Sequence, residues 1–221
     1  MAEEVMLLDF WPSPFGMRAR IALREKGVSF DTREENILIL TNKSPFLLEM
    51  NPVHKKIPVL IHNGRPVCES LVIVQYIDET WGRECPLLPS DPHERARARF
   101  WADYVDKIFP ALRTVLLSPA GEAQEAAKEY IEGLKVLEGE LGDKTYFGGE
   151  RFGYVDVSLI PMYNLFYSLE KLASCSVAEE CPKLLGWAER CMQRESVAVS
   201  LVDRHELYEF ILVLKKHRQL Q

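Results

Sequence analysis

The stretch LLDFWPSPFGMR, residues 7–18, contains the transition that decides the fold. Its apolar run, Leu7–Trp11, is typical of a buried strand and stops at a serine between two prolines. An arginine-rich amphipathic segment follows at once, and Pro14 suits the first position of a helix. Ser13 is therefore predicted to lie between a strand and a helix, as an N-cap whose oxygen accepts a backbone N–H.

Short apolar runs and helical stretches alternate from this point to about residue 81. The dipeptide Asn63-Gly64 is a strong hairpin signal. The β-branched run at 69–81 is compatible with a strand, but its length and apolar rhythm favour a buried helix. We expect strands at 5–11, 28–35, 59–61 and 66–68, and helices at 14–27, 44–52 (or a turn) and 69–81. This order, βαβαββα, is thioredoxin-like, which makes the first part of the chain an α/β domain.

The chain changes character after residue 81. Residues 82–91 are rich in proline and turn formers and are predicted to be a linker between domain 1–81 and domain 92–221. The second domain is predicted to be all-helical. We expect helices at 93–117 (broken or bent at Pro110), 121–143 (ending at Gly142), 154–172 (the central buried helix), 181–196 and 202–217.

Composition excludes several classes of function. The chain of 221 residues carries 27 basic and 33 acidic residues, a net charge of −6, and no basic stripe, so nucleic-acid binding is not expected. No apolar run approaches the ~18 residues of a membrane helix, and the acidic start, MAEEV, is unlike a signal peptide. The five cysteines include no C-x-x-C pair, and no His/Cys cluster has metal spacing. We therefore expect a cytosolic protein with reduced thiols and no metal or membrane partner.

Four stretches carry a resemblance to a known family: DFWPSPFGMRARIAL, MNPVHKKIPVLIHNGRPVCES, LLPSDPHERARARFWADYVD and LGDKTYFGG. They resemble the plant tau class of cytosolic glutathione transferases, from about residue 5 to the C-terminal helix. The resemblance implies the fold of that family, a thioredoxin-like domain followed by an all-helical domain. It also implies a homodimer, glutathione as co-substrate, and a role in detoxification and the stress response.

The resemblance gives Ser13 a second role. A hydroxyl has two acceptor lone pairs and one donor, so Ser13 can cap the helix and still direct its proton outward. A thiolate there would accept that hydrogen bond and lie at the positive end of the helix, and both effects lower the pKa of the thiol. Ser13 occupies the position of the serine that stabilises the glutathione thiolate in tau-class enzymes.

Glutathione has three other groups to anchor. Lys56 and Lys43 match lysines that bind the glycyl carboxylate, although most lysines are simply solvated. The Ile57–Pro58 bond matches a cis-proline whose neighbour pairs with the cysteinyl backbone; the alternative is a proline that starts a strand. Glu69 and Ser70 are expected to open a helix and hold the γ-glutamyl end, or only to cap that helix.

One segment departs from the tau-class pattern. Residues 36–42 read NILILTN, where the family usually has a shorter and more polar loop. Its apolar run, Ile37–Leu40, is unusual beside an open cleft and would pack over the site or widen a dimer contact. This segment bears directly on the position of Lys43.

The resemblance also implies a pocket for a hydrophobic second substrate, between the domains and facing Ser13. Each candidate is otherwise an ordinary core residue. By matching the family pattern, the candidates are Trp11, Phe15, Pro110, Thr114, Leu117, Leu165, Phe210 and Leu214. Pro110, Thr114 and Leu165 replace residues that are often aromatic or basic, which predicts a less aromatic and less charged pocket.

We therefore predict a glutathione transferase that conjugates the glutathione thiolate to hydrophobic electrophiles, with hydroperoxide reduction as a side activity. One alternative is a carrier that holds glutathione conjugates or apolar metabolites without turnover. Another is a thiol transferase or dehydroascorbate reductase, but that chemistry needs a cysteine in place of Ser13. Asp156 is predicted to support folding, by reaching back to the Gly153 N–H.

Overall fold

A computed structural model describes residues 3–35, 43–81 and 85–219. The unusual segment Ile37–Leu40 lies outside the described residues. The chain divides into two compact units, Met1–Leu88 and Pro89–Gln221. The division falls inside the stretch 82–91 for which a linker is predicted.

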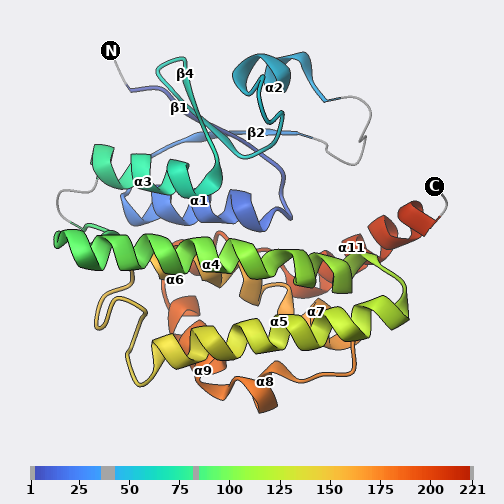
Figure 1. The fold of residues 1–221 in the computed structure, drawn as a ribbon. Helices are drawn as coiled ribbons and strands as arrows, with labels where there is room; N and C mark the ends of the chain where they lie inside the picture. The colour runs from blue at the N-terminus through green and yellow to red at the C-terminus, as the bar shows by residue number, and fades with distance from the viewer. Residues whose placement is uncertain (1–2, 36–42, 82–84, 220–221) are drawn as a thin grey trace. The chain divides into compact units, whose positions relative to one another are not determined.

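The first unit has the predicted order βαβαββα, as Figure 1 shows. The α1 helix begins directly after Ser13, and its end is followed by Gly27 with a φ of 64°. Asn63 and Gly64 both have positive φ, as a tight two-residue hairpin turn requires. The elements are β1 (Val5–Asp9), α1 (Pro14–Glu25), β2 (Asp31–Glu34), α2 (Pro45–Met50), β3 (Val59–His62), β4 (Arg65–Cys68) and α3 (Ser70–Trp81).

The four strands form one mixed sheet in the order β2-β1-β3-β4. The β1 strand pairs parallel with β2 and antiparallel with β3, and β3 pairs antiparallel with β4. In Figure 1, α1 and α3 lie side by side on one face of this sheet and α2 lies on the other. The sheet therefore needs apolar side chains on both faces.

Alternation along the strands supplies both faces. Leu8 and Val59 pack with Leu47 of α2 in one apolar cluster. Leu7 and Leu60 are also fully buried, and as the neighbours of Leu8 and Val59 in the chain they point to the opposite face.

The second unit is helical, as predicted. The helices α4 and α5 are long and lie side by side (Figure 1). Gly142 ends α5 with a φ of 57°. The helices are α4 (Pro92–Leu117), α5 (Ala120–Leu141), α6 (Tyr154–Tyr163), α7 (Phe166–Leu172), α8 (Val177–Glu180), α9 (Pro182–Met192), α10 (Glu195–Ala198) and α11 (Arg204–Gln219).

Two expectations about the helices need correction. Residues 154–172 do not form one helix, because the chain turns between α6 and α7. Pro161 lies in the last turn of α6, and a proline ring obstructs the carbonyl four residues earlier. Since this segment is apolar on all sides, its hydrophobic pattern could not reveal the turn. The chain is also not broken at Pro110, which lies inside the 26-residue helix α4, so of the two predicted alternatives the break is wrong.

The start of α6 is held by Asp156, as predicted. Its Oδ2 accepts the Gly153 N–H at 2.8 Å, and its Oδ1 accepts the Phe147 N–H at 3.1 Å and the Trp187 Nε1–H at 2.7 Å. Asp156 is fully buried, so these three donors take the place of water. Asp156 therefore links three segments of the helical unit.

Within the part of the chain that the structure describes, no helix has both the length and the apolar character needed to cross a membrane.

Candidate active site

The sheet brings several predicted site residues to one end of the first unit. Leu8 near the end of β1 lies opposite Val59 at the start of β3. Val59 in turn lies opposite Cys68 at the end of β4. The segments that follow β1, precede β3 and follow β4 must therefore share one edge of the sheet. These segments carry Ser13, Lys56 with Ile57, and Glu69 with Ser70.

Ser13 caps α1 as predicted. Its Oγ accepts the Gly16 N–H at 3.2 Å, and its side chain is largely buried. Among the residues that the structure describes, none accepts the hydroxyl proton of Ser13. The hydroxyl is therefore able to donate to a ligand while it caps the helix. The cap and the donor role are compatible at the same side chain.

Ser70 begins α3 and contacts an arginine that the sequence analysis missed. Arg18 of α1 is fully buried, and its Nη1 donates to Ser70 Oγ at 3.1 Å. The Arg18 guanidinium also lies 5.1 Å from the centre of the Phe15 ring. An arginine is almost never fully buried unless it is paired. The position of Arg18 among the apolar residues on the buried face of α1 is therefore the signal that could have identified it.

Glu69 has a φ of 71°, which a residue with a side chain rarely adopts. Such a conformation often marks a binding site, where the surrounding structure holds the strain. The Glu69 carboxylate contacts His54 Nδ1, and both side chains are about half exposed. The carboxylate therefore does not cap α3 and stands at the open edge of the site.

Asn51 organises the loop that precedes β3. This buried side chain accepts the His54 N–H at 3.1 Å and donates to the Lys56 carbonyl at 2.9 Å. The Ile57–Pro58 bond is cis, as the resemblance implies. Within the described residues, neither the N–H nor the C=O of Ile57 has a hydrogen-bond partner. Both groups are thus available to an extended peptide backbone.

The two lysines differ in their surroundings. Lys43 Nζ donates to the Lys55 carbonyl at 2.5 Å, so this ammonium is tied to the loop before β3. Lys56 is exposed, and its ammonium forms no hydrogen bond or ion pair with another described residue. The structure therefore brings both lysines to the same loop. Of the two, only Lys56 has an ammonium without a hydrogen-bond partner among the described residues.

The candidates for the hydrophobic pocket fall in both units. Trp11 and Phe15 belong to the first unit and are partly buried. The other six belong to the helical unit, where α11 packs against α4 and α7. Pro110, Thr114 and Leu117 share one face of α4, and Phe210 and Leu214 share one face of α11. Leu165 is buried at the start of α7.

The helical unit also contains a separate cavity of about 150 Å³. None of the candidates for the hydrophobic pocket lines it. Its lining includes Tyr163, Asn164, Phe166, Tyr167, Glu170 and Arg204.

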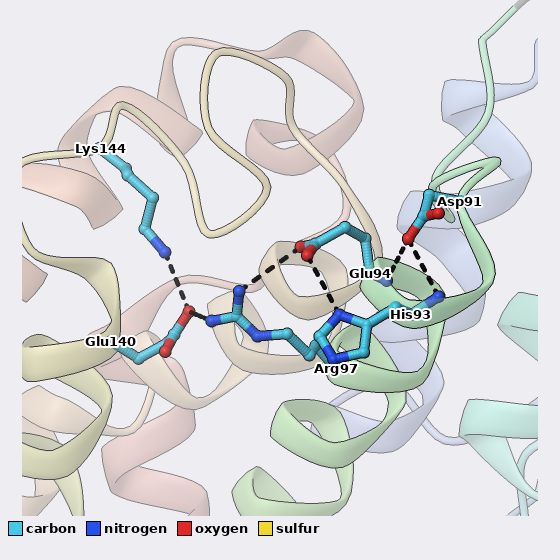
Figure 2. A network of polar contacts seen from close by, with 6 residues as sticks. All are labelled: Asp91, His93, Glu94, Arg97, Glu140 and Lys144. Atoms are coloured by element: carbon cyan, nitrogen blue, oxygen red, sulfur yellow. Dashed lines mark hydrogen bonds and ion pairs between the residues drawn. The ribbon is translucent and has the colours of Figure 1, made fainter.

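Asp91, His93 and Glu94 bring ligand atoms close together at the start of α4, as a metal site would. Figure 2 shows that these atoms already have partners. Asp91 Oδ1 accepts the N–H groups of His93 and Glu94 at 3.0 and 2.9 Å. Arg97 lies 3.6 Å from Glu94 and 3.0 Å from Glu140. These contacts are those of a helix cap and a surface ion-pair network.

The cysteines do not supply a reactive thiol at this site. All five are free, and Cys68 is the one next to Glu69. Burial, and secondarily the charge of Glu69, raises the pKa of Cys68. A raised pKa keeps the thiol protonated, whereas thiol-transfer chemistry needs a thiolate. The site therefore offers a hydroxyl at Ser13 and not a nucleophilic sulfur.

Comparison with known proteins identifies the family. The family model for the glutathione S-transferase N-terminal domain matches residues 3–79, and the one for the C-terminal domain matches residues 101–195. Glutathione S-transferase U25 of Arabidopsis thaliana is 60% identical over 217 residues, which cover 98% of this chain and 97% of that protein. The probable glutathione S-transferase parA of Nicotiana tabacum is 58% identical over 215 residues, 97% of this chain and 96% of its own.

Two solved structures share the fold and the class. The structure of rice GST1 in complex with glutathione has a TM-score of 0.91 and 46% identity, and covers 98% of both chains. The tau-class glutathione S-transferase from mango has a TM-score of 0.87 and 40% identity, and covers 96% of this chain and 98% of its own. Relatives of this identity and coverage, with both domains in the same order, leave one assignment: this chain belongs to the tau class of the glutathione S-transferases.

Proposed function

We propose that Ser13 is the catalytic residue of this transferase, and that it holds bound glutathione as a thiolate for attack on hydrophobic electrophiles. The observation that carries this proposal is that, among the described residues, the Ser13 hydroxyl has one hydrogen bond, which it accepts from the Gly16 N–H. The hydroxyl proton remains available for the glutathione sulfur, and the start of α1 adds the positive end of a helix. Both effects lower the pKa of the bound thiol.

The rest of the tripeptide is assigned to the same edge of the sheet. Ile57 would pair through its backbone with the cysteinyl unit, because both of its polar groups are unpaired among the described residues. Lys56 would bind the glycyl carboxylate, with Lys43 as a second cation. Glu69 would accept from the γ-glutamyl ammonium. Ser70, at the start of α3, would bind the γ-glutamyl carboxylate together with backbone N–H groups of that helix.

The second substrate is proposed to be an apolar electrophile. We assign residues 1–81 to glutathione binding and residues 92–221, with Trp11 and Phe15, to the hydrophobic pocket. Hydroperoxide reduction would be a side reaction of the same thiolate. We further propose a homodimer that works in the cytosol and serves detoxification. The five free cysteines are typical of a reducing compartment.

The substitution Ser13→Ala tests the catalytic role. We expect kcat for conjugation of a chloronitrobenzene to fall by roughly one to three orders of magnitude, as when one donor to an anion is removed. Glutathione affinity should fall much less, because the carboxylate and backbone anchors remain. The pH at which kcat/KM rises should move upward, since the bound thiol becomes a weaker acid. The measurement is steady-state kinetics across pH with purified protein.

The matched control is Ser176→Ala. Ser176 is also an N-cap, and its side chain accepts the Glu179 N–H at 3.3 Å in the helical unit. Both variants should lose about 0.5–2 kcal/mol of stability through the missing cap. Only Ser13→Ala should change the pH profile. Full activity with an unshifted profile in Ser13→Ala would show that Ser13 serves as a cap alone.

A further inference from the structure

The backbone of Trp11, two residues before Ser13, is held by charged side chains from two other elements. Glu34 at the end of β2 accepts the Trp11 N–H at 2.9 Å. Arg20 of α1 donates through Nη2 to the Trp11 carbonyl at 2.8 Å. Side chains thus satisfy both polar groups of Trp11, in a turn that belongs to no helix or strand.

Asp9 holds the residue before Trp11 and packs against α1. It is the last residue of β1 and is 1% exposed. Its Oδ1 accepts the Phe10 N–H at 2.7 Å, and its Oδ2 lies 3.1 Å from Arg20 Nε in an ion pair. A Cβ placed on Gly16 would come within 1.7 Å of Oδ1. The carboxylate therefore fills the space that glycine leaves in the first turn of α1.

The contact with Gly16 places Asp9 next to the residue that Ser13 caps. Gly16 is the residue whose N–H donates to Ser13 Oγ at 3.2 Å. The Ser13 N–H in turn donates to the Phe10 carbonyl at 2.9 Å. Asp9 thus contacts both ends of the turn from Phe10 to Gly16, and Arg20 binds Trp11 near its start.

The ionisation of Asp9 depends on its burial and on the charges of Arg20 and Glu34. Burial raises the pKa of Asp9 to about 6, against the opposing effect of Arg20. Glu34, which also faces the pair, adds a second negative charge. When Asp9 is ionised, its attraction to Arg20 offsets part of the cost of burying the carboxylate. The arrangement of the turn therefore depends on Asp9 and Arg20 together.

We propose that Asp9 and Arg20 are positioning residues for Ser13. Their ion pair, with Glu34 on Trp11, holds the turn so that the Ser13 hydroxyl presents its proton to the glutathione sulfur. This inference rests on the proposed function of Ser13. It goes beyond that function, because it assigns the geometry of the hydroxyl to a buried ion pair that is not among the proposed glutathione anchors.

The test is Asp9→Asn, a change of similar shape that removes the charge. The readout is the pKa of the bound glutathione thiol, followed by the ultraviolet absorbance of the thiolate in the complex. We expect this pKa to rise and kcat to fall by about 10- to 100-fold, the scale of a small misplacement of a reacting group. Glutathione affinity should change little, since the anchors at Lys56, Ile57 and Glu69 are untouched.

A double-mutant cycle shows whether Asp9 acts through Ser13. In a Ser13→Ala background, Asp9→Asn should reduce kcat only slightly further, because the hydroxyl that it positions is gone. If the two substitutions together reduced kcat by the product of their separate effects, Asp9 would act independently of Ser13, and the proposal would be overturned. A Ser13→Ala variant with unchanged activity would instead refute the function proposed for Ser13, so the two failures are distinguishable.

Asp78→Asn is the matched control. Asp78 is another buried carboxylate of the first unit, 2.7 Å from Lys26 Nζ, and it accepts the Leu87 and Leu88 N–H groups. This variant should lose stability without shifting the pKa of the bound thiol. An equal shift in Asp78→Asn would mean that general loosening, and not positioning, causes the effect, and would overturn the proposal.

A third variant keeps the test decisive if Asp9→Asn does not fold. Glu34 is exposed, so Glu34→Ala should fold while it removes the acceptor of the Trp11 N–H. We expect the pKa of the bound thiol to rise in this variant too, by less than in Asp9→Asn. An unshifted thiol in Glu34→Ala would overturn the proposal.

Discussion

At the scale of the residue, the function that we propose depends on how the donor and acceptor groups of one hydroxyl are used. The Ser13 oxygen accepts from Gly16, and this leaves its proton for a ligand. The sequence was sufficient to predict this cap, because the cap involves residues three positions apart. It could not reveal Arg18 as the partner of Ser70, since 52 positions separate them and only the packing of α1 on α3 brings them together.

Asp9 should make the stability of the protein depend on pH in a defined window. Its pKa is raised from 3.8 to about 6 by burial, so the folded state binds this proton more tightly than the unfolded chain. The stabilisation from this group is full below about pH 4 and is lost as the pH rises through about 6. Two pKa units correspond to about 3 kcal/mol. The unfolding free energy of the wild type minus that of Asp9→Asn should therefore be about 3 kcal/mol more positive at pH 4 than at pH 7, because asparagine does not titrate.

Urea unfolding at a series of pH values measures this difference. Exposed acidic groups titrate equally in both proteins and cancel in the comparison. Curves for wild type and Asp9→Asn that run parallel from pH 4 to pH 7 would contradict the raised pKa.

At the scale of the element, sequence patterns located most helices and strands because their signals are local. Periodicity, helix caps and turn residues predicted the order of the first unit and the end of α5 at Gly142. The patterns failed at 154–172, because a segment that is apolar on all sides has no hydrophobic face whose interruption could mark the turn after α6. Element ends that depend on neighbours are thus the least predictable.

Two glycines of α5 should respond in opposite ways to alanine. A Cβ on buried Gly133 would lie 2.7 Å from Ile108 Cγ2 of α4, whereas a Cβ on exposed Gly139 meets nothing within 4 Å. Gly139→Ala should raise stability by about 0.5–1 kcal/mol, because alanine restricts the unfolded chain and favours a helix. Gly133→Ala should lower stability by about 1–3 kcal/mol through overpacking.

Thermal and urea unfolding of the two variants provide the measurement, and each serves as the control for the other. Equal stability of Gly133→Ala and Gly139→Ala would show that α4 does not pack closely against α5 at Gly133.

At the scale of the whole molecule, the sheet brings together segments between residues 13 and 70 that carry the glutathione anchors we propose. We expect the protein to bind immobilised glutathione and to elute with free glutathione. Lys56→Ala should weaken glutathione binding roughly tenfold, as expected for loss of a hydrogen bond to a charged group. Lys128→Ala is the control, because Lys128 is an exposed lysine of α5 paired with Glu125.

Titration calorimetry with glutathione gives the affinities of both variants. Equal affinities for Lys56→Ala and wild type would remove Lys56 from the glutathione site, while leaving the fold and Ser13 unaffected.

The sequence by itself determined what depends on neighbours in the chain: the strand and helix order of the first unit, the Ser13 cap, the Asn63-Gly64 turn and the glycine that ends α5. It also carried enough motif for the class to be identified. Only the tertiary structure decided the strand order β2-β1-β3-β4, the burial of Arg18 against Ser70 and the fit of Asp9 into the space at Gly16. The physical reason is how far apart in the chain the interacting residues are. Caps and turns are made by atoms a few residues apart, whereas a buried ion pair exists only after the sheet register and helix packing have excluded water from it.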